Sequence, residues 1–221
     1  MVKIIKRIRK LSPDPVKYLR LHRNENGQPF KEKIDLDKYY PDIEIAIKKI
    51  RSYFKLDINL NIILGLGAES IIKDIFIWHS QKNKKKNILI YDPNYYMYQH
   101  FAKIFKYKIT KFKLYKDKSI YLNAKEIIKI LKQKKINLLS LINPSAPIEK
   151  TINQNELLKI IKFCKKNNIT IVLDEVYNKF SYTKNIKLLK TFSNVIIVKS
   201  FSKMAGYPGI RAGFAICNKK I

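Results

Sequence analysis

Short apolar runs, separated by stretches with helical periodicity, constrain the fold of this chain more than any other feature of its sequence. Each run is short, continuous and rich in Ile, Val and Leu, which is typical of strands that are covered on both faces. The strands predicted in this way are Asn61–Leu64, Ile88–Tyr91, Ile109–Leu114, Asn137–Ile142, Ile169–Leu173, Val195–Val198 and Ala212–Ile216.

Helices are predicted between these runs. Asn123 and Asn153 precede two of them and are suitable N-caps, because an Asn side chain can accept from the first free backbone N–H groups. The alternation predicts an α/β fold, a mostly parallel sheet sandwiched by helices, in which ligands bind at the carboxyl ends of the strands. The predicted helices span roughly Ile43–Tyr53, Ala68–Ser80, Tyr95–Phe105, Ala124–Lys132 and Gln154–Lys166.

Length and charge narrow the class of protein. The 221 residues suffice for one substantial α/β domain or two small ones. Residues 1–35 lack the pattern and are predicted to form an N-terminal arm, which leaves residues 36–221 as one domain. Lys and Arg number 46 against 17 Asp and Glu, a net charge of +29, but the lysines are spread along the whole chain. We therefore expect weak adhesion to polyanions and no specific nucleic-acid partner.

Neither a disulfide scaffold nor a membrane span is expected. The chain has two cysteines and no run of about 18 apolar residues. The basic segment 2–11 is not followed by the apolar core of a signal peptide. These features predict a protein of the reducing cytoplasm.

Two predicted strands end in residues that suit a ligand. Gly67 and Ala68 follow the first strand, where small residues let N–H groups at a helix start approach a phosphate, although a tight turn also needs glycine. Asp174 ends a buried strand, where an acid is costly without a cation or several donors. A helix cap or an ordinary ion pair is the alternative explanation for Asp174.

Lys203 is the most informative candidate. It follows Ser200 and Ser202 just past a buried strand, and Gly206 and Arg211 come after it. In a partly dehydrated setting the neutral amine of a lysine becomes available as a nucleophile. Lysine is so abundant here that only these neighbours favour a site over a surface position.

A dinucleotide-binding oxidoreductase is the main alternative enzyme class. The first strand, Gly65-x-Gly67, a helix and a next strand ending in Asp92 imitate the fingerprint of that fold. Ser70 replaces its third glycine, and the acid lies 25 residues beyond Gly67. This interpretation also leaves the candidate lysine at position 203 without a role.

The segment from Ser200 to Gly213 fits the frame S-x-S-K-x-x-G-x-x-G-x-R-x-G. It resembles the fold type I pyridoxal-phosphate-dependent aminotransferases of class I and II, most closely their histidinol-phosphate aminotransferase branch. Each further match is weak alone, but the ordered set is specific and runs from about residue 20 to the end. These matches are Asn24-Glu25-Asn26, Tyr40-Pro41-Asp42, Gly67-Ala68-Glu69, Pro93-Asn94-Tyr95-Tyr96-Met97-Tyr98 and Asp174-Glu175-Val176-Tyr177.

The resemblance implies an enzyme of amino-acid biosynthesis that uses pyridoxal 5'-phosphate. It would transfer an amino group between an amino acid, or an amino-acid-like phosphate, and a 2-oxo acid. Lys203 would hold the cofactor covalently and shuttle the substrate's α-proton. Asp174 would pair with the protonated pyridine nitrogen. Tyr177 would form a hydrogen bond with the ring's 3-oxygen, and Tyr95 would stack on the ring.

The resemblance assigns the cofactor's phosphate to a second set of groups, one of which comes from a neighbouring subunit and so implies a homodimer. A dianion of this kind needs a cation and several donors. The set comprises backbone at Gly67 and Ala68, the side chains of Ser200, Ser202 and Arg211, and Tyr40 of the partner subunit.

The chain departs from the family in two places. The family's N-P-N-N-P-T-G reads Asn143-Pro144-Ser145-Ala146-Pro147-Ile148-Glu149, so Ala146 cannot donate the bond that the second Asn of the pair makes to the 3-oxygen. The family also continues into a small C-terminal domain that grips the substrate's carboxylate, whereas this chain stops at Ile221. We therefore expect a second copy or a separate C-terminal chain as partner, and a truncated, split or non-catalytic form stays open.

Overall fold

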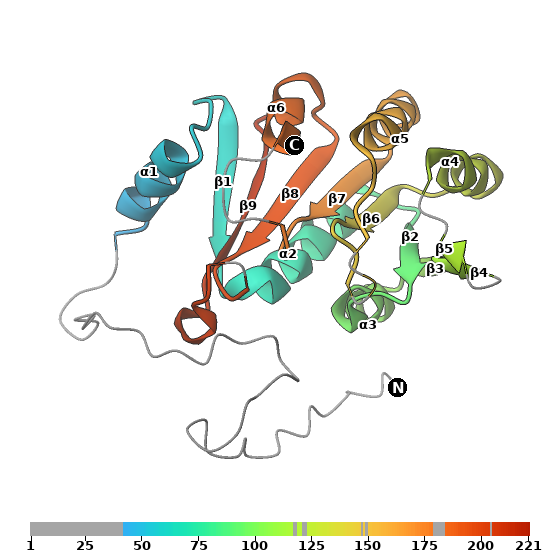
Figure 1. Ribbon diagram of the computed structural model, residues 1–221, viewed down its shortest axis with the longest axis horizontal. Coiled ribbons are helices and arrows are strands. Elements are labelled where there is room, and N and C mark those ends of the chain that lie inside the picture. The colour runs from blue at the N-terminus through green and yellow to red at the C-terminus, as the bar shows by residue number, and fades with distance from the viewer. Residues whose placement is uncertain are drawn as a thin grey trace, which may run out of the picture.

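A seven-stranded sheet forms the centre of the part of the chain that the structure describes (Figure 1). The computed structural model describes residues 42–116, 119–120, 123–146, 148, 150–178, 184–203 and 205–221. Each strand coincides with one of the predicted apolar runs to within two residues at either end. The strands are β1 (Leu60–Gly65), β2 (Asn87–Asp92), β3 (Lys108–Lys113), β6 (Leu138–Ile142), β7 (Thr170–Asp174), β8 (Val195–Ser200) and β9 (Gly213–Asn218).

The strand order is β1-β9-β8-β7-β6-β2-β3, and within this sheet only β9 runs in the direction opposite to the other strands. β1 therefore lies at an edge of the sheet, and four strands separate it from β2. In a dinucleotide-binding fold the first two strands are adjacent, so that the ribose-binding acid lies beside the glycine-rich turn. The oxidoreductase interpretation is therefore wrong.

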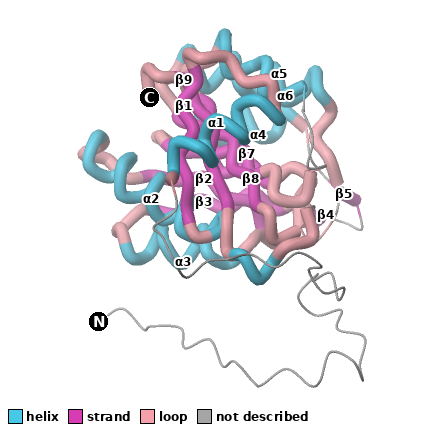
Figure 2. Tube along the Cα trace, turned by 90° about the vertical axis from the view of Figure 1, so that its left-hand side faces the viewer, coloured by secondary structure: helices cyan, strands magenta, loops and turns pink. Residues whose placement is uncertain are grey.

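Helices cover both faces of the sheet, which confirms the predicted α/β architecture (Figures 1 and 2). The face covered by α2 and α3 is called the α2/α3 face below, and the other face the α5 face. No helix among the described residues is long and apolar enough to cross a membrane. The helices of the α5 face are α1 (Ile43–Tyr53), α4 (Ala124–Gln133), α5 (Gln154–Lys166) and α6 (Lys184–Thr191), and those opposite are α2 (Gly67–Lys82) and α3 (Tyr96–Ile104).

Three short elements were not predicted. They are α6, the small hairpin of β4 (Tyr115–Lys116) and β5 (Ser119–Ile120), and the 3-10 turn η1 (Pro208–Ile210). In α6 the buried apolar residues are Ile186 and Leu189, less than one turn apart. A pattern that covers a single turn does not separate a helix from a loop in the sequence.

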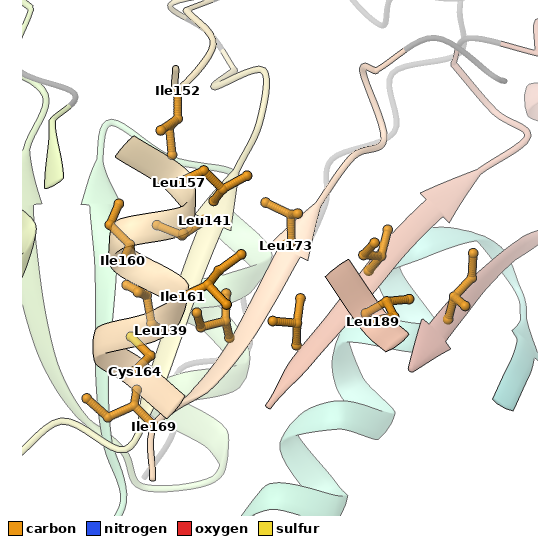
Figure 3. Packing of buried hydrophobic residues seen from close by; sticks show 14 of the residues in the cluster. Leu139, Leu141, Ile152, Leu157, Ile160, Ile161, Cys164, Ile169, Leu173 and Leu189 are labelled. Carbon is orange, nitrogen blue, oxygen red and sulfur yellow. The ribbon is translucent and has the colours of Figure 1, made fainter. Parts of the chain in front are cut away.

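The α5 face shows how periodicity builds the core (Figure 3). Leu157, Ile161 and Cys164 recur at helical spacing and are buried against the sheet. Ile160 belongs to the same buried stripe, whereas Leu158 is only half-buried. Burial in this apolar layer raises the pKa of the Cys164 thiol to about 12, so the thiol stays protonated.

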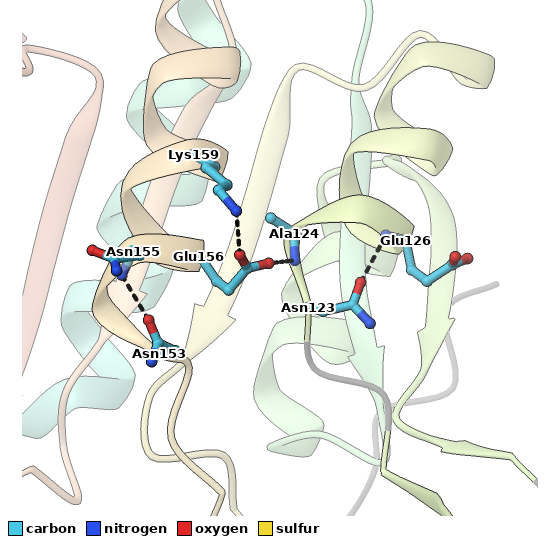
Figure 4. A network of polar contacts seen from close by, with 7 residues as sticks. All are labelled: Asn123, Ala124, Glu126, Asn153, Asn155, Glu156 and Lys159. Carbon is cyan, nitrogen blue, oxygen red and sulfur yellow. Dashed lines mark hydrogen bonds and ion pairs between the residues drawn. The ribbon is translucent and has the colours of Figure 1, made fainter.

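The predicted N-caps of α4 and α5 are both formed (Figure 4). The Asn123 side chain accepts from the Glu126 N–H at 3.0 Å, and the Asn153 side chain accepts from the Asn155 N–H at 2.9 Å. Glu156 joins the two helix starts, because its carboxylate accepts from the Ala124 N–H at 2.7 Å. Side-chain acceptors at helix starts satisfy N–H groups that have no partner within the helix.

Candidate active site

The candidate residues meet at one edge of the sheet because of its strand order. Ile142 of β6 is aligned with Asp174 of β7, and β7 pairs in turn with β8. Ser200, the last residue of β8, is aligned with Gly213, the first residue of β9, and Gly213 is aligned with Gly65 of β1. The carboxyl ends of these parallel strands and the start of β9 thus share one edge, where ligands of open α/β sheets bind.

The first turn of α2 forms one end of the site. Gly67 starts this helix with φ at +76°, a left-handed conformation that favours glycine. A Cβ on Gly213 would lie 2.6 Å from the Gly67 carbonyl carbon and 2.8 Å from the Ala68 nitrogen, so only glycine lets β9 approach the helix start. Leu66, the N-cap residue, makes no side-chain hydrogen bond to this turn.

Arg211 lies against the same turn. A Cβ on Gly67 would be 2.9 Å from Nη2 of Arg211, which places the guanidinium beside the helix start. Nη1 of Arg211 donates to the Ser202 hydroxyl at 3.3 Å, and the Ser202 N–H donates to the Ser200 hydroxyl at 3.1 Å. A guanidinium, two buried hydroxyls and the positive end of a helix dipole together form an environment for an anion.

Asp174 forms the other end of the site. Its side chain is 3% exposed, and its two oxygens accept from different donors: the Val176 N–H at 3.0 Å and the Tyr98 hydroxyl at 2.9 Å. Burial raises the pKa of this carboxyl to about 6, although both donors favour its ionised form. The predicted alternative of an ordinary ion pair falls instead on the next residue, Glu175.

Lys203, Tyr177 and Tyr95 lie in the loops around this edge. The Lys203 Nζ is 6.0 Å from the centre of the Tyr177 ring. The Tyr95 hydroxyl, just before α3, donates to Glu69 of α2 at 3.5 Å. The predicted contribution of Tyr40 lies outside the described residues, as does Asn24-Glu25-Asn26 of the arm.

Asn143 supports the loop after β6. Its side-chain oxygen accepts from the Ile152 N–H at 2.9 Å, and its own N–H donates to the Asp174 carbonyl at 2.8 Å. The side-chain oxygen of Asn143 is thus committed to holding the chain that returns toward α5. The residue therefore has a structural use that does not replace the amide missing at Ala146.

Two buried polar contacts near the site were missed from the sequence. Tyr98 contacts Asp174 from a helix that precedes it by 76 residues. On the α5 face, Lys199 and Glu175 form a fully buried ion pair at 3.0 Å, and the Asn185 side chain donates to Glu175 at 2.6 Å. The only sequence signal for Tyr98 is its place at the end of the family segment that starts at Pro93.

The fold and this edge define a class of α/β proteins with a buried acid at one end of the site and an anion-binding turn at the other. A family model for "Aminotransferase class I and II" matches residues 25–221. The chain belongs to this family.

Relatives point to one branch of the family. The chain is 31% identical to the histidinol-phosphate aminotransferase of Clostridium beijerinckii, over 95% of this chain and 58% of that protein. It is 32% identical to the enzyme of the same name from Campylobacter jejuni subsp. doylei, over 92% of this chain and 58% of that protein. The solved structure of the histidinol-phosphate aminotransferase from Clostridium acetobutylicum superposes with a TM-score of 0.70 at 27% identity, covering 82% of this chain and 53% of that one. The chain thus spans between half and three-fifths of the length of these relatives.

Proposed function

We propose that this sheet edge binds pyridoxal 5'-phosphate and that the chain takes part in an amino-transfer reaction. One observation carries the proposal: a buried acid at the end of β7 and a guanidinium at the start of α2 lie along one sheet edge. The cofactor has a matching pair of ends, a protonated ring nitrogen and a phosphate dianion. Membership in the aminotransferase family supports this assignment.

The phosphate end is served by groups that are already arranged for an anion. The Arg211 guanidinium would supply the full positive charge, and the N–H groups of the first turn of α2 would donate from Gly67 and Ala68. The hydroxyls of Ser200 and Ser202, linked to each other and to Arg211, would complete the donor set. Preformed donors of this kind bind a dianion with little reorganisation.

The ring end is served by Asp174. Its carboxylate would accept the proton of the ring nitrogen, and a cation placed there would offset the burial that now disfavours the ionised acid. When bound, pyridoxal phosphate supplies an electron sink for the substrate's α-carbon. Lys203 would hold the cofactor and carry the α-proton on its Nζ, and Tyr177, whose ring lies near that amine, would donate to the 3-oxygen. Tyr95, just before α3, would stack on the ring.

The substrates that suit this site are an amino acid, or an amino-acid-like phosphate, and a 2-oxo acid. The names of the relatives favour an amine that bears a phosphate. We also propose that a second copy of the chain completes the assembly. Large apolar side chains are exposed on elements at the β1 edge of the sheet, and burial between two copies would remove them from water. They are Ile43 and Ile45 of α1, Ile63 of β1, Leu66, and Ile210 of η1.

Cofactor uptake tests the proposal directly. The purified chain is mixed with pyridoxal phosphate, treated with borohydride and digested, and the labelled peptide is identified by mass spectrometry. We expect one label, on Lys203, and its loss in Lys203→Ala. Lys162→Ala removes an exposed lysine on the outside of α5 and is the matched control that should label normally. Equal uptake by all three proteins would refute the assignment.

Activity and assembly are separate measurements. Conversion of the bound cofactor by a panel of amino acids, followed by absorbance, reports amino transfer, and light scattering reports the mass in solution. Cofactor uptake without conversion by any amino acid would favour the non-catalytic alternative. Conversion that requires an added C-terminal chain would identify a divided enzyme.

A further inference from the structure

We propose that Tyr98 is a positioning residue that aims the Asp174 carboxylate at the cofactor's ring nitrogen and keeps that carboxylate ionised. The inference rests on the proposed binding of pyridoxal phosphate. The contact in question joins the Asp174 carboxylate to the protein interior and does not involve the ligand.

The geometry is fixed by two elements that are distant in sequence. Asp174 ends β7, and Tyr98 lies in the first turn of α3 on the α2/α3 face. The Tyr98 hydroxyl donates to Oδ2 at 2.9 Å, while the Val176 N–H donates to Oδ1 at 3.0 Å. With a separate donor on each oxygen, the plane of the carboxylate cannot turn freely. The remaining lone pairs of both oxygens then point in a set direction.

Only one of these donors comes from outside the loop. Val176 is two residues from Asp174 and moves with it. Tyr98 is 0% exposed and is packed into the α2/α3 core, so its hydroxyl is anchored to the body of the domain. Tyr98 is therefore the contact that ties the direction of the carboxylate to the rest of the fold.

Toward the ionised acid, the phenol can act only as a donor. Burial, followed by the adjacent charge of Asp174, holds the pKa of Tyr98 well above its usual value of 10, so the hydroxyl keeps its proton. A hydrogen bond given to a carboxylate stabilises its charged form. Burial acts in the opposite direction, and with both donors present the pKa of Asp174 is about 6.

At neutral pH, the loss of one hydrogen bond would measurably change the ionised fraction of Asp174. An acid with a pKa of about 6 is roughly 90% ionised at pH 7, whereas a pKa higher by about one would leave it roughly half ionised. A single donor to a buried carboxylate has an effect of about this size. Without Tyr98, the cofactor would meet a partly protonated acid.

Other titratable and charged groups lie near Asp174 at this edge of the sheet. Glu175 follows it in the chain, and its charge adds slightly to the upward shift of the Asp174 pKa. Lys199 of β8 faces Glu175 at 3.0 Å on the α5 face. Lys203 and Arg211 lie in the loops at the same sheet edge. Tyr95, just before α3, adds slightly to the upward shift of the Tyr98 pKa.

The experiment compares two variants that each lose one buried phenol hydroxyl. Tyr98→Phe removes the donor and keeps the ring in its packing site. Tyr91→Phe is the matched control: Tyr91 is also buried, it packs on the α5 face, and its hydroxyl has no hydrogen-bond partner among the described residues. Carbon-13 NMR follows the Asp174 carboxyl during a pH titration of the cofactor-free chain, with Asp174→Asn used to assign the signal. Pyridoxal phosphate affinity is then measured at several pH values.

We expect Tyr98→Phe to raise the titration midpoint of Asp174 by about one pH unit. The midpoint of the pH profile for cofactor affinity should move upward with it, so that affinity falls about twofold at pH 7 and about fivefold at pH 6, and recovers in alkali. Tyr91→Phe should change neither midpoint. An unchanged Asp174 midpoint in Tyr98→Phe, or equal shifts in both variants, would overturn the inference. A shifted midpoint in a chain whose wild type takes up no cofactor would overturn the proposed function, while the control of Asp174 by Tyr98 would stand.

Discussion

Glu175→Gln is expected to destabilise the chain strongly, although it changes one atom type and no volume. Glu175 is fully buried on the α5 face and has two donors around it, Lys199 Nζ at 3.0 Å and the Asn185 side chain at 2.6 Å. A glutamine offers one acceptor oxygen and an NH2 group in place of two acceptor oxygens. Whichever way the amide turns, its NH2 faces Lys199 or Asn185, which are both donors.

The magnitude follows from the charge that is left behind. Lys199 is 1% exposed, so its ammonium stays buried when the carboxylate of Glu175 is removed. The Phe54 ring, whose centre is 5.7 Å from Nζ, would still contact it. A ring contact replaces only part of an ion pair. Removing one partner of a buried pair costs about 3–5 kcal/mol, mostly because the other charge stays buried. This is a large share of the roughly 5–15 kcal/mol that stabilises a typical domain.

The assay is urea unfolding of the cofactor-free chain, followed by circular dichroism. We expect Glu175→Gln to lower the unfolding free energy by about 3–5 kcal/mol with an unchanged denaturant slope. Adding Lys199→Met removes the stranded ammonium and keeps the length of its stem, so the double variant should regain much of the loss. A single variant within about 1 kcal/mol of wild type, or a double variant that is weaker than the single one, would refute the reasoning.

Three further outcomes are expected. Acid should remove stability from the cofactor-free chain through His79, because burial lowers its pKa from the usual value of 6.5; the contribution is present above that pH and lost as the pH falls below it. Asp174 acts in the opposite direction over the same range, so the two chains are compared: from pH 7 to 5 the unfolding free energy should change less unfavourably in His79→Gln than in wild type. The methyl group of Gly213→Ala would overlap the Gly67 carbonyl carbon, so this variant should bind the cofactor at least roughly tenfold more weakly in an absorbance titration and lose about 1–3 kcal/mol of unfolding free energy. The methyl group of Gly209→Ala meets open space, so this control variant should change neither quantity. Cofactor affinity should rise with pH through about 6 as Asp174 ionises, and a flat profile would contradict the proposed pairing with the ring nitrogen.

The sheet and one end of the site could be predicted because their signals are local. A continuous apolar run such as that ending in Asp174 specifies a buried strand from a few neighbouring residues. Gly67 at the start of α2 and the N-caps Asn123 and Asn153 likewise depend on conformations set within one turn. Each of these predictions depends only on residues that are close together in the sequence.

The missed contacts depend on strand order, which no short segment contains. Tyr98 reaches Asp174 only because α3 packs on the face where β7 and β6 are neighbours. Lys199 meets Glu175 only because β8 is placed next to β7. Asn143 shows the same limit, because its use in bonding Ile152 depends on the path of a loop. Such pairs become visible only after the strands have been placed side by side.

Alternation along β7 explains why two consecutive acids have different environments. Asp174 turns toward Tyr98 on the α2/α3 face, and Glu175 turns toward Lys199 on the α5 face. The folded-state pKa of Asp174, about 6, is above its unfolded value near 3.8, so its ionisation costs folding free energy as the pH rises through this range. The difference between these two pKa values corresponds to a cost on the order of 3 kcal/mol above about pH 6.

A helix cap does not explain that cost. Asp42 caps α1 from an exposed position and accepts from the Glu44 N–H at 2.8 Å, which shows that capping needs no burial. Asp174 is instead held in the interior with its carboxylate fixed by Tyr98 and Val176. A cation that arrives with a ligand would recover the free energy that burial removes. The free-energy cost of the ionised acid in the free chain would thus be offset when a protonated ring binds, which strengthens binding. Asp174→Asn should therefore bind the cofactor more weakly even where its fold is intact.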